Sequence, residues 1–367
     1  MNLESLMNRD WERSVVGKLG GADELAKSAR ETKAFLRART IRSAVDLLRI
    51  VLAYCLSQTG LRSTVAWASA IGLADLSNVA LLQRLRRSGD WLGLLVGQAL
   101  ARHAPQASQG RCIRIVDGTS VPKAGASAKK RSQLWRIHSA FDLPEERFGY
   151  FVLTDQQEGE KLDFIPVKKG EIRLADRAFM QPDRIASVQA QGGDVVVRAG
   201  WKSVCWCDAD GKPFDIIEAF REAAQSGRID RPILVERKGG APLALRLIAV
   251  KKPPQATEAA RRKARRAAQQ EGYTISQEAL EAADWVIIVT SLTPQAFSTD
   301  EVLTLYRLRW RIELAFKRLK SLIGLKGPPG FDERSAKPFI LAHLLIILLL
   351  EPFIDELEDS PRWPAAA

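Results

Sequence analysis

Residues 112–121, CIRIVDGTSV, place an acidic side chain in the middle of a stretch that is typical of a buried β-strand. A carboxylate on a core strand costs free energy unless a cation or an ion-pair partner compensates its charge. Gly118 directly follows Asp117 and would allow a ligand to approach the backbone closely. We interpret Asp117 as a candidate metal ligand; the alternative is that it starts a turn with Gly118.

Further strand-like segments follow this stretch along the chain. Two of them are predicted to form a three-stranded meander with it, and two more strands alternate with short helices. The expected strands are 134–141, 147–154, 171–175 and 195–198, and the expected helices are about 159–167 and 182–191. This β-β-β-α-β-α-β order predicts an α+β or α/β fold with an RNase H-like core, a mixed five-stranded sheet with helices that lacks only its closing helix.

A second acidic residue, Asp176, ends the fourth predicted strand. The first and fourth strands of an RNase H-like core are neighbours, so Asp117 and Asp176 can converge on one cation. Alternatively, Asp176 only caps the helix that follows. Carboxylate oxygens are the ligands that Mg²⁺ prefers, and phosphoryl transfer by two such ions needs at least three acidic residues at one point.

The third candidate lies on a basic helix near the C-terminus. Between residues 306 and 326, Glu313 is the only acidic residue among seven Lys or Arg residues. At 3.6 residues per turn, the side chains at offsets 0, 3, 7 and 14 share one stripe of the helix. They are Tyr306, Arg309, Glu313 and Lys320. The stripe predicts a metal ligand or general base within a phosphate-binding surface.

The chain is predicted to divide into five segments. Residues 1–105 are expected to be a helical DNA-binding domain that contains a helix-turn-helix at about 62–87. An ordinary helical bundle with a solvated basic face is the alternative. The remaining segments are the first part of the catalytic core (106–199), a β-rich insertion with a basic helix (200–283), the second part of the core with the Glu313 helix (284–335) and a C-terminal helical tail (336–367).

Composition restricts the partner and the compartment. The net charge of +12 indicates a polyanionic partner, either nucleic acid or an acidic membrane surface. The N-terminus lacks a signal-peptide pattern, and the strongest apolar run, residues 339–350, is too short to span a membrane. We interpret that run as a buried or partner-contacting helix. Together with only four cysteines, these features predict a cytoplasmic protein.

Three motifs resemble those of the IS-four family of bacterial insertion-sequence transposases, which belong to the DDE class. The helix spacing Tyr306-x2-Arg309-x3-Glu313-x6-Lys320 is similar to the signature of that family. Asp117-Gly-Thr119 and Asp176-x-Ala178-Phe179 resemble its two upstream Asp motifs. The resemblance covers about residues 111–326.

The resemblance implies a cut-and-paste enzyme that acts on the terminal inverted repeats of its element and joins the 3′ ends to target DNA. Asp117, Asp176 and Glu313 would hold two Mg²⁺ ions, for which Mn²⁺ can substitute. Further residues would bind the cleaved DNA end. They are Tyr306, Arg309 and Lys320 by the signature, Arg177, Arg198 and Lys317 by position, and Trp285, on which a flipped base would stack if a hairpin intermediate forms.

The implied partner is double-stranded DNA, both the terminal repeats and the target, and joining two ends implies a homodimer in the synaptic complex. No membrane partner is expected, and the protein would associate with the bacterial nucleoid through DNA. Two alternatives remain open from the residues. One is another RNase H-like nuclease or resolvase, and the other is a catalytically inactive DNA-binding protein derived from a transposase.

Overall fold

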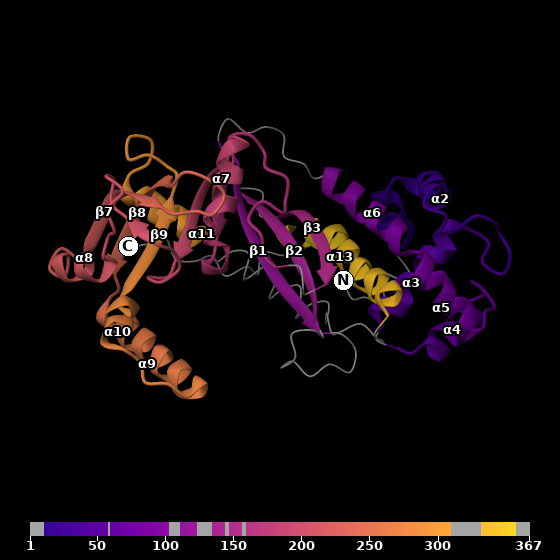
Figure 1. Ribbon diagram of the computed structural model, residues 1–367. Helices are drawn as coiled ribbons and strands as arrows, with labels where there is room; N and C mark the ends of the chain where they lie inside the picture. Colours follow the sequence, from indigo (N-terminus) through magenta and orange to yellow (C-terminus); the bar gives the residue numbers. More distant parts are fainter. Residues whose placement is uncertain are drawn as a thin grey trace.

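A computed structural model of the 367-residue chain describes residues 11–57, 59–102, 111–122, 134–143, 147–155, 159–309 and 332–356. Helices from the N-terminal part gather at one end of an elongated molecule, and a twisted sheet extends from them to the other end (Figure 1). The long helix α13 (Glu333–Glu356) returns to the N-terminal helices (Figure 1).

The N-terminal helices agree with the helical pattern predicted for this part of the chain. They are η1 (Glu12–Val16), η2 (Gly17–Leu19), α2 (Gly21–Glu31), α3 (Ala44–Leu56), α4 (Leu61–Ala70), α5 (Asn78–Arg87) and α6 (Gly89–Arg102). The hydroxyl oxygens of Ser43 and Ser77 accept hydrogen bonds from the backbone N–H groups three residues later, at 3.0 and 3.1 Å. Such N-caps satisfy donors that the first helical turn leaves unpaired. Helices α4 and α5 occupy the positions predicted for the helix-turn-helix.

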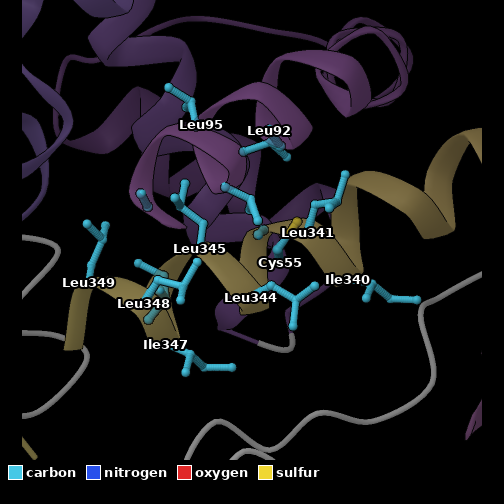
Figure 2. Close-up of a cluster of buried hydrophobic side chains, with 14 of the residues drawn as sticks. Cys55, Leu92, Leu95, Ile340, Leu341, Leu344, Leu345, Ile347, Leu348 and Leu349 are labelled. Carbon is cyan, nitrogen blue, oxygen red and sulfur yellow. The ribbon is translucent and has the colours of Figure 1, made fainter. Parts of the chain in front are cut away.

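The apolar run near the C-terminus is a buried helix, which is one of the two interpretations of its sequence. Residues 339–349 of α13 are all buried. They pack against α3, α5 and α6, and Figure 2 shows Leu344, Leu345 and Leu348 among Cys55, Leu92 and neighbouring side chains. Within the described residues, no helix has the length and apolar character that a membrane span requires.

One mixed sheet joins all nine described strands. They are β1 (Ile113–Pro122), β2 (Leu134–Leu143), β3 (Arg147–Asp155), β4 (Ile172–Ala175), β5 (Asp194–Ala199), β6 (Trp206–Cys207), β7 (Arg228–Val235), β8 (Leu243–Lys251) and β9 (Trp285–Thr290). Their order is β3-β2-β1-β4-β5-β9-β8-β7-β6. Strands β1, β4 and β5 are parallel, and the other pairs are antiparallel. The first five strands in this order are those predicted for the RNase H-like core.

The inserted region differs from the separate unit that its sequence suggests. Its strand β8 pairs with β9 along residues 246–251, so the three strands of the insertion, β6 to β8, extend the core sheet beyond β9 to nine strands. Without this pairing, one side of β9 would present unpaired backbone donors and acceptors. The helices of this region are α8 (Ile216–Glu222), α9 (Pro254–Glu271) and α10 (Gln277–Ala283).

The two faces of the sheet belong to different hydrophobic clusters. One face packs against the N-terminal helices, α11 (Thr299–Leu308) and α13, and the other packs against α7 (Pro182–Ala190), α8 and α10. Strand β5 shows the alternation, because Val196 belongs to the first cluster and Val195 and Val197 to the second. By the same alternation, Asp117 of β1 lies on the face of Ile115, toward α11.

Candidate active site

The register of two parallel strands brings the predicted aspartates together. Ile115 of β1 is the Cα partner of Leu174 of β4. Two residues further along each chain, Asp117 and Asp176 therefore lie at the same level where β4 ends. Neighbouring strands are about 4.8 Å apart, which is close enough for two carboxylates to share a cation. This arrangement agrees with the predicted convergence of Asp117 and Asp176.

Asp117 lies within β1, opposite Ser139 of β2, and does not start a turn. Its Oδ1 accepts a hydrogen bond from the Gly118 N–H at 2.8 Å. The pKa of Asp117 is raised to about 6, mainly because burial disfavours the carboxylate, and the negative charge of Asp176 adds to the increase. The Gly118 hydrogen bond and Arg309 act in the opposite direction.

Asp176 caps the helix that follows it, as one interpretation of its sequence predicts, and also lies near Asp117. It is the N-cap of the short helix η4 (Arg177–Phe179), and its Oδ1 accepts a hydrogen bond from the Ala178 N–H at 2.8 Å. It also lies close enough to Asp117 for its charge to raise the pKa of that residue. Capping therefore holds the Asp176 carboxylate at the end of β4 without removing it from Asp117.

Helix α11 brings basic and aromatic side chains to the same place. It starts with a capping box, in which Ser298 accepts from the Glu301 N–H and the Glu301 carboxylate accepts from the Ser298 N–H. At its other end, the Arg309 guanidinium lies 5.9 Å from the centre of the Tyr306 ring. Arg309 lowers the pKa of Asp117, so the end of α11 lies beside the acidic pair.

Two further predicted DNA contacts lie near this cluster. Arg198 is exposed on β5. Burial raises the pKa of Tyr306, and the positive charge of Arg198 partly offsets this increase. Arg177 is exposed on η4, directly after Asp176, and its side chain runs along Gly200, where a Cβ would lie 3.1 Å from Cδ of Arg177. Both positions leave the guanidinium groups accessible to a phosphate.

Trp285 is not part of this cluster. It is only 5% exposed and stacks on Phe220, with ring centres 4.8 Å apart and an interplanar angle of 8°. Trp285, Ile287 and Val289 alternate onto the face that α8 and α10 cover. The structure therefore gives Trp285 the role of a core strand residue, and a base can stack on it only if the ring leaves Phe220.

The structure adds one acidic residue that the sequence analysis does not identify. The Glu160 carboxylate lies beside Gly118, where a Cβ would be 2.6 Å from Oε1, and it faces Arg136 at 3.7 Å. Burial raises the pKa of Glu160, and Asp176 contributes to the increase. Gly118, which the sequence predicts to let a ligand approach the backbone, is approached by this carboxylate instead. The helix predicted at about 159–167 is wrong, because the segment that holds Glu160 forms turns and irregular backbone.

A buried ion-pair network supports the two strands that carry the aspartates. The Arg114 guanidinium donates to both Asp142 oxygens, at 2.6 and 2.9 Å, and also faces Glu171 at 3.2 Å. Arg173 pairs with Glu171 at 2.5 Å and donates to backbone carbonyls of residues 165 and 166. Arg114 and Arg173 are register partners, three residues before Asp117 and Asp176. The network fixes both strands relative to residues 162–166.

The remaining predicted site residues, Glu313, Lys317 and Lys320, lie outside the described residues. Within the described part of the chain, no group of three or more His, Cys, Asp or Glu side chains is arranged to hold a metal ion. The structure thus supplies two of the three predicted carboxylates together with Tyr306 and Arg309.

Comparison with known proteins agrees with this geometry. The family described as transposase DDE domain matches residues 108–348. The chain belongs to the DDE transposase family. It is 37% identical over 365 residues to the putative transposase InsL for insertion sequence element IS186A of Escherichia coli strain K12, covering 98% of this chain and 97% of that protein. It is 36% identical to the transposase for insertion sequence element IS421 of Escherichia coli over the same shares. The protein is a DNA-cleaving and strand-transferring enzyme.

The donor set of this DDE transposase fits a divalent cation. Asp117 and Asp176 provide hard oxygen ligands on adjacent strands, and a cation between them would offset both the burial and the mutual repulsion that raise the pKa of Asp117. The Gly118 and Ala178 N–H groups each donate to one oxygen of these carboxylates. Membership of the DDE transposase family implies divalent-metal dependence, and the chemistry of this pair suits it.

Proposed function

We propose that this transposase binds the terminal inverted repeats of its insertion sequence, cleaves at the ends and joins the 3′ ends to target DNA. One observation carries the proposal: the register of β1 and β4 brings Asp117 and Asp176 to the same level, beside Arg309 of the α11 end. Carboxylates that hold a cation next to a fixed guanidinium suit the transfer of a phosphoryl group.

Asp117, Asp176 and Glu313 would hold two Mg²⁺ ions, for which Mn²⁺ can substitute. When bound, such a pair of ions would polarise the phosphodiester and stabilise the negative charge on both the attacking and the leaving oxygen. The sequence spacing of Glu313, four residues after Arg309 in the stripe predicted from the helical period, supports its assignment as the third ligand.

The basic side chains orient the DNA in this proposal. Arg309 and Arg198 flank Tyr306 and would bind phosphates at the cleaved end, with Arg177 beside Asp176. Lys317 and Lys320 would extend the same surface. Fixed guanidinium groups of this kind offset the negative charge that develops on the phosphate oxygens, without reorganisation during the reaction.

Cleavage through a hairpin intermediate would require a base to leave the DNA stack. In this proposal the base would stack on Trp285 after the ring separates from Phe220. A homodimer would hold the two ends of the element in the synaptic complex, because both ends must be joined to one target.

Cleavage of a labelled duplex that carries one terminal repeat and its flank tests the proposal. D117A, D176A and E313A should each abolish Mg²⁺-dependent cleavage while they retain binding to the duplex. D210A, which removes an exposed carboxylate from a loop, should cleave like the wild type and serves as the control. Wild-type cleavage by any of the three variants would disprove that carboxylate's role.

A joining assay separates the proposed enzyme from the alternatives. A transposase joins a precut end to a plasmid without the repeats, whereas a resolvase cleaves branched DNA and does not join. An inactive DNA-binding relative would neither cleave nor join. Absence of joining by the wild-type protein would contradict the proposed strand transfer.

A further inference from the structure

Helix α9 is unusual among the described helices because it projects from the body of the protein (Figure 1). It is 18 residues long, and Ala268 is its only buried side chain. Half-buried residues such as Thr257 and Ala264 form the seam along which it packs on α10. The rest of its surface faces solvent over almost five turns.

Four exposed basic residues cover the face opposite this seam. At 100° per residue, Arg262, Lys263, Arg265 and Arg266 lie within an arc of about 160°, and the buried seam lies on the other side. None of the four forms an ion pair or a side-chain hydrogen bond with a described residue. By contrast, the Arg261 guanidinium at the seam donates to both oxygens of Asp284, at 2.7 and 2.5 Å.

Repulsion between cations on this face destabilises the helix when no partner is bound. Arg262 and Arg266 are four residues apart on one helix face, and like charges at that spacing destabilise a helix. The face has no large apolar residue, because its other members are Glu258 and Ala and Gln residues, and the four cations outnumber its single acid. A helix that binds a membrane surface needs an apolar face beside its basic one, so this composition favours a hydrated polyanion.

A line of cations connects α9 to the active site. Lys252 precedes α9 by two residues and donates to the Ala283 carbonyl. In the sheet register, Ala175 of β4 is the Cα partner of Val197 of β5, so Arg198 lies on the strand next to β4 at the level of Asp176. Lys252 directly follows β8, two strands from β5 in the sheet order, and the charge of Arg198 contributes, after burial, to its lowered pKa. Arg198 and Lys252 therefore lie between the aspartates and the start of α9.

We propose that the exposed face of α9 binds the phosphate backbone of the duplex whose scissile phosphate lies at Asp117 and Asp176, that is, the end of the element with its flank. The inference rests on the proposed function and adds a second, sequence-independent contact to it. Charge complementarity identifies the occupant, since duplex DNA presents regularly spaced phosphates and the four basic side chains have no partner of their own. The positions of Arg198 and Lys252 between the aspartates and α9 favour the cleaved duplex over the target.

The double variant R262Q/R266Q tests this contact. Binding to the labelled duplex with one terminal repeat and its flank is measured over a range of salt concentrations. Each phosphate contact contributes about 0.9 to the slope of log K against log salt, so two lost contacts should make the slope less negative by roughly 1.8. The melting temperature should not fall, because Gln keeps the helix and removes a like-charge pair.

Two controls accompany this variant. R262K/R266K keeps both charges and should retain most of the slope. K212Q/K238Q removes the same number of charges from exposed loops of the inserted region and should leave the slope unchanged. A loss of slope in K212Q/K238Q equal to that in R262Q/R266Q would indicate a bulk charge effect and would overturn the inference.

The outcomes also separate this inference from the proposed function. If R262Q/R266Q binds like the wild type while the wild type still cleaves, the inference is wrong and the proposed function stands. If end binding is unchanged and only joining to the plasmid decreases, α9 serves the target and the inference is overturned. If the wild type does not cleave the repeat at all, the proposed function itself is wrong.

Discussion

At the scale of single residues, the acidic pair shows how a site and its fold oppose each other. Asp117 is half-buried beside Asp176, so its ionised form is disfavoured in the metal-free protein. This unfavourable ionisation follows from placing both carboxylates at one point, where together they can bind a cation. A ligand site in a metal-dependent enzyme is expected to be strained in this way until its cation binds.

Replacing Asp117 by Asn should therefore stabilise the metal-free protein. Folding raises the pKa of Asp117 to about 6, so the ionised group opposes folding above that pH, and the penalty fades as the pH falls toward its unfolded value of about 3.9. At pH 7 in EDTA, we expect D117N to increase the free energy of unfolding by about 1 to 2 kcal/mol. Urea denaturation at pH 7 and pH 4 measures this, and an equal gain at both pH values would contradict the explanation.

In the buried ion-pair network, a substitution should lower the stability of the protein. R173M would leave the Glu171 carboxylate buried without its 2.5 Å partner, and removing one member of a buried pair typically costs about 3 to 5 kcal/mol. R184M removes a guanidinium that pairs with Asp163 at 3.1 Å but is 43% exposed, so its loss should cost less than about 1 kcal/mol. Chemical denaturation of both variants tests the contrast, which fails if their losses are equal.

At the scale of elements, the two helices α11 and α13, which follow the last strand in the chain, have different roles. The capping box starts α11 so that Tyr306 and Arg309 reach the aspartates at its other end. The apolar helix α13 instead packs its buried residues 339–349 against α3, α5 and α6. Its side chains pack among those of the N-terminal helices (Figure 2), and both α6 and α13 contact β3.

Truncating the α13 core should be costly. L345A removes a fully buried side chain, and such Leu-to-Ala changes cost about 2 to 5 kcal/mol because they leave a cavity. L36A removes a Leu that is 62% exposed and is the matched control, with an expected change below about 1 kcal/mol. Thermal and urea denaturation give the comparison, and a small loss for L345A would mean that α13 is not part of the folded core.

At the scale of the whole molecule, one sheet connects parts that serve different purposes. The strands β1, β4 and β5 carry the acidic pair and Arg198, and the strands of the insertion extend the same sheet toward α9 (Figure 1). A rigid connection of this kind keeps the projecting basic helix at a set position relative to the aspartates. Binding of DNA at both places would then depend on one folded unit.

Divalent cations should stabilise this unit through the aspartates. Any ligand that binds only the folded state raises the melting temperature, and the rise grows with its concentration. We expect Mg²⁺ and Mn²⁺ to raise the melting temperature of the wild type and to have no such effect on D117A/D176A. The control D210A should respond like the wild type, and an equal response of D117A/D176A would place the cation elsewhere.

Much of the core and of the site could be predicted from local pattern. The strands around Asp117 and before Asp176 could be predicted from their apolar residues and from the turn residues that bound them. The order of strands and helices along the chain then indicates which strands pair. The basic stripe from Tyr306 onward follows from helical spacing alone. Glu160 and the buried partners Arg114 and Arg173 have no such local signal, because their roles depend on contacts with residues far along the chain.

The sequence by itself determined Asp117 and Asp176, the strands that hold or precede them, and the helical segment that ends beside Arg309, because alternation and helical period are properties of neighbouring residues. Only the tertiary structure decided that β8 pairs with β9, that Trp285 stacks on Phe220, and that Glu160 approaches Gly118. The physical reason is that a strand edge needs backbone hydrogen-bond partners and an apolar sheet face needs side chains packed against it. Which segment provides them depends on the packing of the whole chain.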